Sequence, residues 1–330
     1  MNTHTSALTS SSARAALVNT KVLSLRKKGR HASSSSSSSG KQTKKQTMII
    51  KAVSNSVTPD NDWGESTQAV HNGERGGRPR ISDSLTTPIV CTSTYTFKDT
   101  KELIDYQEGN YGSFEYGRYG NPTTRAVEEK IRLLEGGDDC LLSASGMCTA
   151  VTMLLSLVPA GGHIVTTTDC YRRTRQFIQT FLPKMGITST VLDPSDYDGL
   201  QKALDEHDCS LYFSESPTNP YLRCVDIDRI SKMCKPKGCL VCIDGTFATP
   251  CNLKPLKFGA DLVIHSASKY MGGHNDVLAG VIVGQKEAVS KVRAFHNIVG
   301  GVLDPHAAYL ILRGLKTLSL RVERHNSNAQ

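Results

Sequence analysis

The sequence predicts an α/β fold in which helices wrap a mostly parallel β-sheet. Two observations predict it. From about residue 120 onward, short apolar runs alternate with longer segments whose apolar residues recur at helical spacing. Such alternation is typical of strand–helix–strand units, and the length of 330 residues allows a sizeable core. Ligands of such sheets bind beyond the carboxyl ends of the strands, so the residues directly after each strand are candidates for a functional site.

The individual elements follow from apolar spacing and from the residues that begin and end helices. Pro122–Leu134 has a proline in its first turn and Gly136 just beyond its end, which is the expected asymmetry of a helix. In chain order, the other helices are expected at Met147–Val158, Tyr171–Met185, Tyr197–Leu204, Asp226–Cys234, Lys286–Asn297 and His306–Asn326. The strands are expected at Leu141–Ser143, His163–Thr168, Thr188–Leu192, Ser210–Ser214, Leu240–Asp244, Leu262–Ser266 and Val277–Val283.

The N-terminal segment differs from the rest of the chain in composition. Residues 1–59 carry ten Lys or Arg and no Asp or Glu, and a run of seven serines extends from Ser33 to Ser39. A basic, serine-rich, acid-free segment without a compact apolar core is typical of a transit peptide. We therefore expect residues 1–55 to be a disordered transit peptide for the plastid stroma, with the mitochondrion as the alternative destination. The other interpretation is a basic tail that binds nucleic acid.

Charge and composition argue against several other classes of protein. The formal charge of +8 comes from the N-terminal segment, because residues 60–330 carry 29 Lys or Arg against 31 Asp or Glu. A nearly neutral body lacks the basic face of a nucleic-acid-binding protein. No apolar run approaches the roughly 20 residues of a membrane helix. Cys239 and Cys242 have zinc-like spacing but no matching second pair, so we expect core cysteines and no metal.

Side chains with useful chemistry follow five of the predicted strands. They are a lysine, an aspartate, an asparagine, a tyrosine, several hydroxyls and a Gly-Met pair at a helix start, namely Lys269, Asp244, Asn219, Tyr171, Thr246, Ser266, Ser268, Gly146 and Met147. Because the carboxyl ends of parallel strands meet at one edge of a sheet, we expect these side chains to lie close together.

Taken together, these side chains suit pyridoxal phosphate. The helix that starts near Gly146 offers free backbone N–H groups to a phosphate, and glycine lets the anion approach closely. Lys269 can form a Schiff base with an aldehyde. Asp244 can pair with a protonated ring nitrogen, and Tyr171 can stack on a flat ring. The glycine motifs G-x-G-x-x-G and G-x-x-x-x-G-K-[ST] are absent from the sequence, so a nucleotide has no comparable anchor.

In their order along the chain, these residues form motifs that resemble a known family. The motifs are Tyr116-Gly-Arg118-Tyr-Gly-Asn-Pro-Thr123, Ser145-Gly-Met147, Asp169-Cys-Tyr171, Glu215-Ser-Pro-Thr-Asn219-Pro, Ile243-Asp244-Gly-Thr246-Phe and Ser266-Ala-Ser-Lys269-Tyr-Met-Gly-Gly-His274. From about Ser66 onward, the chain resembles the Cys/Met-metabolism family of pyridoxal-phosphate enzymes. The resemblance implies this cofactor and a type I, aspartate-aminotransferase-like large domain, with the smaller C-terminal domain largely missing.

The resemblance also implies a role for each site residue. Lys269 would bind the cofactor and then move protons, while Tyr171 would stack on the ring and help to deprotonate the incoming amine. Glu115 would lie near the far end of the substrate. The other cofactor-binding residues would be Gly146, Met147, Asn219, Asp244, Thr246, Ser266 and Ser268, joined from a neighbouring subunit by Tyr116 and Arg118. The active unit would then be a homo-oligomer, a dimer or a dimer of dimers, that shares its active sites across subunits.

For the activity, the resemblance implies γ-replacement on an amino-acid substrate. Plant members of the family join cysteine to O-phosphohomoserine, or in other relatives to another O-acyl-homoserine, and so make cystathionine for methionine biosynthesis by transsulfuration. Arg172 and Arg173 stand where relatives commonly have two glycines, and their positive charge would favour a dianionic substrate. The alternative is two solvated arginines on a helix face.

Two other functions stay open at this point. One is a sibling lyase of the family, which eliminates from cystathionine or methionine. The other is a non-catalytic chain that binds pyridoxal phosphate or pairs with longer subunits. In all three cases we expect four parts: a transit peptide (1–55), an N-terminal arm (56–115), the cofactor-binding α/β domain (116–305) and the start of an interdomain helix (306–330).

Overall fold

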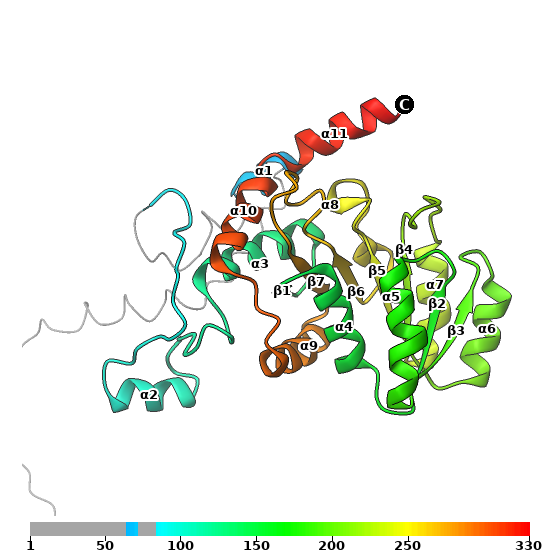
Figure 1. Ribbon diagram of the computed structural model, residues 1–330, viewed down its shortest axis with the longest axis horizontal. Helices are drawn as coiled ribbons and strands as arrows, with labels where there is room; N and C mark the ends of the chain where they lie inside the picture. The colour runs from blue at the N-terminus through cyan, green and yellow to red at the C-terminus, as the bar shows by residue number, and fades with distance from the viewer. Residues whose placement is uncertain (1–63, 72–83) are drawn as a thin grey trace, which may run out of the picture. The chain divides into compact units, whose positions relative to one another are not determined.

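The computed structural model describes residues 64–71 and 84–330. The predicted transit peptide, residues 1–55, lies outside the described residues. Within the described part, a seven-stranded sheet forms the centre and helices cover its two faces (Figure 1). None of the helices in this part is long and apolar enough to cross a bilayer.

The sheet is mostly parallel, as the sequence predicts. Its strands are β1 (Asp139–Ser143), β2 (His163–Thr167), β3 (Thr188–Leu192), β4 (Cys209–Glu215), β5 (Leu240–Asp244), β6 (Leu262–His265) and β7 (Gly280–Gly284). They lie side by side in the order β1-β7-β6-β5-β4-β2-β3. Every pair is parallel except those of β7, which runs antiparallel to β1 and to β6. Strands β1 and β6 therefore run in the same direction, and their carboxyl ends reach the same edge of the sheet.

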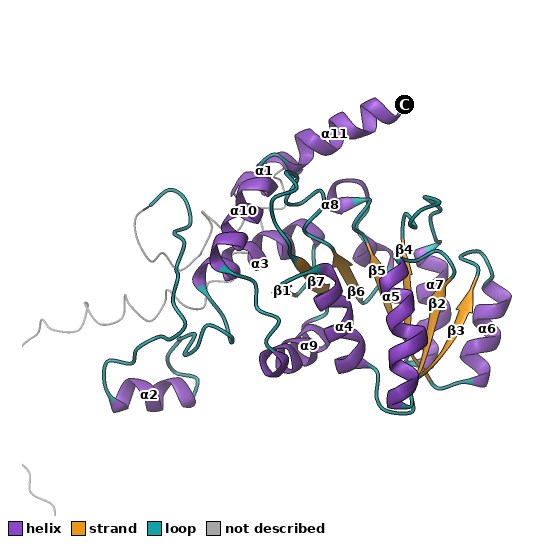
Figure 2. Ribbon diagram, in the orientation of Figure 1, coloured by secondary structure: helices purple, strands orange, loops and turns teal. Residues whose placement is uncertain are grey.

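Helices pack on both faces because successive residues of a strand point to opposite sides. In β1, Leu141 belongs to one apolar cluster and Leu142 to the other. The first face is covered by α4 (Gly146–Leu157), α9 (Lys286–Val299) and the turns that continue α5 (Arg172–Gln176). The second face is covered by α3 (Pro122–Glu135), α6 (Tyr197–Glu206), α7 (Ile227–Cys234) and α10 (Pro305–Leu315) (Figure 2). The remaining α-helices of the described part are α1 (Glu65–His71), α2 (Thr100–Gln107), α8 (Thr249–Asn252) and α11 (Leu318–Ala329).

A buried lysine attaches α1 to this frame. Lys130 of α3 is fully buried, and its ammonium donates to the carbonyls of Ala69 and Val70 at 3.0 and 3.3 Å. Both carbonyls lie at the end of α1, where a cation is stabilising. Helix α1 also packs against α11, so the first and last helices of the described chain lie together (Figure 1).

Most predicted elements lie within two residues of the observed ones, but Tyr171–Met185 is wrong in its second half. Helix α5 gives way to a π-helical turn at Phe177–Phe181 and a 3-10 turn at Leu182–Met185. Pro183 explains the change, because proline has no N–H to donate and its ring clashes with the preceding turn. Gly186 then ends the segment in the left-handed conformation, with φ 76°.

The predicted helix His306–Asn326 is in fact two helices, α10 and α11. Between them lies a tight turn, in which the N–H groups of Lys316 and Thr317 donate to carbonyls three residues back at 3.3 and 3.2 Å. Gly314 lies at this turn and against the loop after β6. An added Cβ at Gly314 would be only 2.4 Å from the carbonyl oxygen of Gly272. The close backbone contact, together with the weak helix propensity of glycine, accounts for the break.

The predicted strand Val277–Val283 begins later than expected, at Gly280. The residue before it, Ala279, is already paired with the loop that follows β6. Its N–H donates to the hydroxyl of Ser268 at 2.9 Å, and its carbonyl accepts the N–H of Ser268 at 3.2 Å. These bonds take the place of ladder pairing and delay the start of β7.

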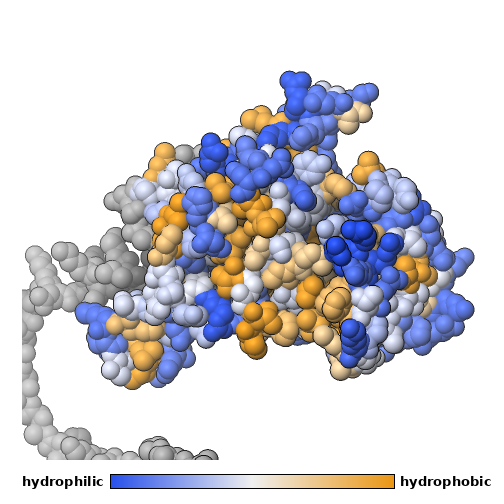
Figure 3. All heavy atoms as spheres, in the orientation of Figure 1, coloured by the Kyte–Doolittle hydropathy of each residue, from blue (hydrophilic) through white to orange (hydrophobic). Residues whose placement is uncertain are grey.

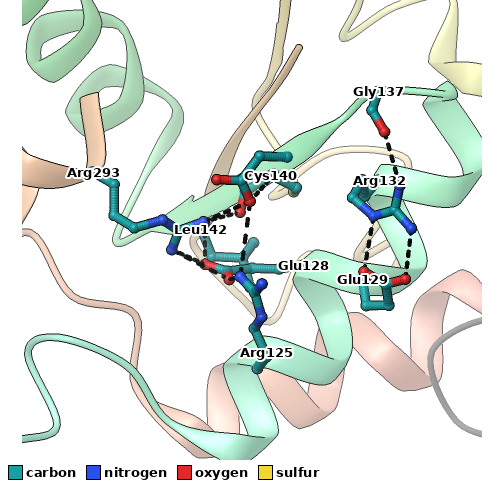
Figure 4. A network of polar contacts seen from close by, with 9 residues as sticks. Arg125, Glu128, Glu129, Arg132, Gly137, Cys140, Leu142 and Arg293 are labelled. Carbon is teal, nitrogen blue, oxygen red and sulfur yellow. Dashed lines mark hydrogen bonds and ion pairs between the residues drawn. The ribbon is translucent and has the colours of Figure 1, made fainter. Parts of the chain in front are cut away.

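A network of charges fixes β1 between α3 and α9 (Figure 4). Glu128 of α3 is buried, and it accepts the N–H of Leu142 in β1 at 3.0 Å. Arg293 of α9 faces Glu128 at 3.4 Å and also bonds Asp139 at 3.0 Å. On the outer side, the half-exposed Arg125 reaches Glu128 at 3.0 Å. The network sets the position of β1, whose carboxyl end leads into α4.

We expect Glu128→Gln to lower the free energy of unfolding by about 2 kcal/mol, because the partly buried Arg293 then keeps only Asp139 as a counter-charge. Chemical denaturation measures the change. Arg125→Gln is the matched control, since it removes the exposed cation of the same carboxylate and should cost less than about 1 kcal/mol. Equal losses in the two variants would contradict the inner position given to Arg293.

Candidate active site

A cavity of about 620 Å³ opens at the carboxyl edge of the sheet. Most of the residues that line it come from the ends of β1, β2, β4, β5 and β6 or from the segments that follow them, where the strand-end rule places a ligand site. Nine residues predicted from the sequence are among them, namely Gly146, Met147, Tyr171, Asn219, Asp244, Thr246, Ser266, Ser268 and Lys269. The structure thus brings together residues that are spread over more than a third of the chain.

The start of α4 forms one wall of the cavity. Ser145 caps the helix, and its hydroxyl accepts the N–H of Cys148 at 3.1 Å. Gly146 lies directly against Ser266, because an added Cβ would be 2.9 Å from the Cβ of that serine. The N–H groups of Gly146 and Met147 belong to the first helical turn, where no intrahelical acceptor exists. The wall therefore offers free donors and the positive end of a helix to an anion.

Strand β7 runs against the same wall. An added Cβ at Gly280 would lie 2.2 Å from the carbonyl oxygen of Ser145 and 2.3 Å from the hydroxyl of Thr149. Glycine is therefore required at Gly280 for the start of α4 to keep its place. On the other side, the hydroxyl of Ser143 donates to the carbonyl of Ser145 at 3.1 Å.

Thr246 connects the ends of β5 and β6. Its N–H and its hydroxyl donate to one oxygen of Asp244 at 2.9 and 2.5 Å. The same hydroxyl oxygen accepts the N–H of Ser266 at 2.8 Å. These bonds hold the Asp244 carboxyl group in one orientation toward the cavity. Burial raises the pKa of Asp244, although the two bonds from Thr246 oppose the rise.

Glu215 is a second buried acid beside Asp244, its partner in the pairing of β4 with β5. Its two carboxylate oxygens accept the backbone N–H groups of Tyr171 and of Asn219, the latter at 2.8 Å. Burial, and next the charge of Asp244, raise the pKa of Glu215 to about 8, while the two N–H donors oppose the rise. Glu215 thus joins the two segments that carry Tyr171 and Asn219.

The side chain of Lys269 is exposed to the cavity, and its amine has no hydrogen bond or ion pair with any described residue. Its backbone, in contrast, is held at both ends. The N–H of Lys269 donates to the carbonyl of Ser266 at 3.1 Å, and its carbonyl accepts the N–H of Gly273 at 2.7 Å. A free amine on a fixed backbone is suited to bond an aldehyde.

These features fit pyridoxal phosphate. The donors at Gly146 suit the phosphate, and the free amine of Lys269 suits the aldehyde. Asp244 and Glu215 form no ion pair within the described chain, so a protonated ring nitrogen would supply the missing positive charge. Tyr171, whose side chain is 45% exposed, offers a ring for stacking.

Tyr116 and Arg118 lie outside this cavity. The guanidinium of Arg118 donates to the carbonyl of Asn297 near the end of α9 and lies 5.3 Å from the ring centre of Tyr116. Both residues are predicted to serve a neighbouring subunit, and their place outside the cavity of their own chain leaves that prediction open.

Glu115 and Arg172 do not line the cavity either. Glu115 accepts the hydroxyl of Tyr106 at 3.0 Å. Arg172 is the first residue of α5, exposed and next to Tyr171 in the chain. Figure 3 shows hydrophilic side chains gathered over α5, beside more apolar surface over α9. The contact of Glu115 and Arg172 with a substrate stays a prediction.

Several residues that line the cavity were not predicted from the sequence. Glu215 directly follows a predicted strand, so the strand-end rule could have added it to the site. Tyr270, Arg321 and His325 also line the cavity. Arg321 and His325 gave no signal, because α11 follows no strand and its position depends on the turn after α10.

Comparison with known proteins places the chain in a family. Residues 66–330 match the family model described as Cys/Met metabolism PLP-dependent enzyme. The chain is 62% identical over 265 residues to cystathionine gamma-synthase 1, chloroplastic, of Nicotiana tabacum, a match that covers 80% of this chain and 49% of that protein. It is 39% identical over 265 residues to cystathionine beta-lyase of Lactococcus lactis, covering 80% of this chain and 67% of the lyase.

The solved structures agree with this family. The fold is similar to that of metB from Corynebacterium glutamicum, with a TM-score of 0.73 and 32% identity over 79% of this chain and 65% of that chain. The prediction of the large domain of a type I pyridoxal-phosphate enzyme is confirmed. The chain spans about half the length of the tobacco relative. Because the family model matches residues 66–330, the chain belongs to the Cys/Met metabolism family of pyridoxal-phosphate-dependent enzymes.

Proposed function

We propose that this protein acts as a cystathionine gamma-synthase, which replaces the leaving group at Cγ of an activated homoserine with the sulfur of cysteine. The observation that carries the proposal is the difference in identity, 62% to the tobacco synthase against 39% to the Lactococcus lyase. The proposed substrate is O-phosphohomoserine, and the proposed product is cystathionine for methionine biosynthesis.

The proposed roles of the cavity residues combine the family resemblance with the contacts described above. Lys269 holds the cofactor aldehyde through its amine, and the start of α4 at Gly146 and Met147 binds the phosphate. Ser266 lies against that wall, while the hydroxyl of Ser268 is already engaged with the backbone of Ala279. We therefore propose that the hydroxyl of Ser266 contributes more to phosphate binding than the hydroxyl of Ser268. Asp244 holds the proton on the pyridine nitrogen.

Proton transfer falls to Lys269. Pyridoxal phosphate supplies an electron sink for the charge that develops on the substrate carbon. With pyridoxal phosphate bound, the amine of Lys269 would take the proton from Cα, and it would have to release that proton before it took a second one from Cβ. Tyr171 stacks on the ring, and Asn219 donates to the ring hydroxyl. Glu215 keeps the backbones of Tyr171 and Asn219 in register through its two carboxylate oxygens.

The choice of leaving group is assigned to the start of α5. Arg172 is exposed and directly follows the ring-stacking Tyr171, so its charge lies close to the entrance of the site. A guanidinium binds a dianionic phosphate through two parallel hydrogen bonds. A succinyl ester carries less negative charge, so the guanidinium attracts it less strongly.

We expect Arg172→Gly to lower the preference for phosphohomoserine over succinylhomoserine about fivefold, measured as the ratio of the two kcat/KM values. An exposed charge contributes roughly 1 kcal/mol, which corresponds to that factor. Lys184→Gln, which removes an exposed cation farther along the same segment, is the control and should leave the ratio unchanged. An unchanged ratio in Arg172→Gly would remove this arginine from the substrate site.

Product analysis tests the proposed activity itself. The protein is incubated with pyridoxal phosphate, phosphohomoserine and cysteine, and separately with cystathionine alone. Formation of cystathionine in the first reaction supports the synthase. A 2-oxo acid released from cystathionine alone, without synthesis, would identify a lyase. A bound cofactor without any product would leave only cofactor binding.

Three further proposals accompany the activity. The plastid stroma is the proposed location, because the tobacco relative is named chloroplastic and residues 1–59 carry ten basic and no acidic residues. A homo-oligomer is proposed because Tyr116 and Arg118 lie outside the cavity of their own chain. The four-part division at residues 55, 115 and 305 is kept, with α10 and α11 in place of one interdomain helix.

A further inference from the structure

Helix α11 reaches the loop that carries Lys269 through one guanidinium. Arg321 uses all three of its nitrogens on backbone or side-chain oxygens of the surrounding segments. Nη1 donates to the carbonyl of Tyr270 at 2.6 Å, and Nη2 donates to the carbonyl of Gly314 at 2.8 Å. Nε donates to the hydroxyl of Thr317 at 3.1 Å. One rigid group therefore spans the loop after β6 and the turn between α10 and α11.

On the loop side, the guanidinium lies so close to Gly273 that a side chain there would collide with it. An added Cβ at Gly273 would lie 2.4 Å from Nη1 of Arg321. Gly273 also closes the turn around the lysine, because its N–H donates to the carbonyl of Lys269 at 2.7 Å. The guanidinium thus contacts both ends of the short segment 270–273 that follows Lys269.

The same face of α11 makes a second contact with Tyr270. His325, one helical turn after Arg321, lies with its ring centre 5.4 Å from that of Tyr270 at an angle of 77°. Arg321 has no ion pair with an acid among residues 84–330, so its donors go to two carbonyl oxygens and one hydroxyl. Charge-assisted bonds of this kind are the stronger hydrogen bonds of a protein.

We propose that Arg321 is a positioning residue for Lys269, which holds the turn after the lysine against α11 so that the amine stays directed into the cavity. The proposal rests on the proposed function, in which Lys269 bonds the cofactor. Arg321 itself touches neither the cofactor nor the substrate in this role. It acts through the carbonyl of Tyr270 and through Gly273.

Arg321→Met tests the proposal, because methionine keeps the apolar stem and removes all three donors. We expect the dissociation constant for pyridoxal phosphate, measured from the absorbance band of the lysine-bound cofactor, to rise about tenfold. Arg324→Met is the matched control. It removes an exposed arginine of the same helix and should leave the dissociation constant unchanged.

Hydrogen exchange of segment 269–273 in the cofactor-free protein provides a readout that does not depend on the cofactor. Faster exchange there in Arg321→Met, but not in Arg324→Met, supports the proposal. Thr317→Val removes one of the three acceptors and should give a smaller effect of the same sign, which keeps the test valid if Arg321→Met unfolds.

The outcomes are separable. A lower melting temperature of Arg321→Met with an unchanged dissociation constant and unchanged exchange in 269–273 would show a merely structural role and overturn the proposal. If the unmodified protein shows no lysine-bound cofactor at all, the proposed function fails. The hydrogen-exchange data then still decide whether Arg321 holds the loop. Faster exchange of segment 269–273 in Arg321→Met supports the positioning role, and unchanged exchange overturns it.

Discussion

Lys269→Ala is expected to abolish the absorbance band of lysine-bound pyridoxal phosphate and to lower kcat for cystathionine formation roughly a thousandfold or more. The variant removes the only amine that lines the cavity among the described residues, and with it both the bond to the aldehyde and the proposed base. The rest of the cavity keeps its donors, so weak binding of free cofactor should remain. Absorbance titration and single-turnover kinetics measure the two effects.

The free energy of unfolding is the control measurement for this variant. The amine of Lys269 has no partner in the described chain, so its removal should change the free energy of unfolding by less than about 0.5 kcal/mol. Lys257→Ala, which removes an exposed lysine outside the cavity, should keep both the absorbance band and the activity. A lysine-type band that persists in Lys269→Ala would place the bond to the cofactor on another residue.

Asp244→Asn is expected to lower kcat by roughly a hundredfold or more, since a neutral amide no longer stabilises a protonated ring nitrogen and the ring withdraws electrons less well. The same change should stabilise the cofactor-free protein by about 1 kcal/mol. It removes one of two buried acids, and the remaining Glu215 then has no negative neighbour in the strand pair. Activity and stability should therefore change in opposite directions.

The raised pKa of Glu215 also predicts how the stability of the cofactor-free protein changes with pH. The pKa of Glu215 is raised from an ordinary 4.5 to about 8, so the folded protein holds its proton more firmly than the unfolded chain. That contribution to stability is fully present below pH 4.5 and is lost as the pH rises toward 8. In Asp244→Asn the loss over this range should be smaller, as measured by denaturation of the cofactor-free protein. Parallel curves for the two proteins would contradict the pairing of Asp244 with Glu215.

Much of the cavity was predictable because parallel strands bring their carboxyl ends to one edge. Asp244, Ser266 and Lys269 each follow a short apolar run, so their meeting required only the fold class. Arg321 lies outside this logic. Its position depends on a turn at Gly314 that breaks an apparently continuous helix. The helical spacing of apolar residues reports local structure, so it cannot predict a contact with a loop that is distant in the sequence. Prediction failed where tertiary contacts overrule local pattern.

The start of β7 shows the same limit at the level of single hydrogen bonds. Val277 to Ala279 have strand-like composition, yet the backbone of Ala279 pairs with Ser268 instead of a neighbouring strand. Glu215 shows a different limit. The position of this acid after a strand was visible, but its two bonds to backbone N–H groups of other segments were not.

Strand β7 contributes no residue of its own to the lining of the cavity, yet it restricts which sequences can form one. At its first position, any side chain would collide with the carbonyl of Ser145 and the hydroxyl of Thr149. Gly280 therefore cannot be substituted freely, although it does not line the cavity. A single methyl group at Gly280 would move the start of α4, and we expect it to disrupt the proposed anion site without any change to the residues proposed to bind the anion.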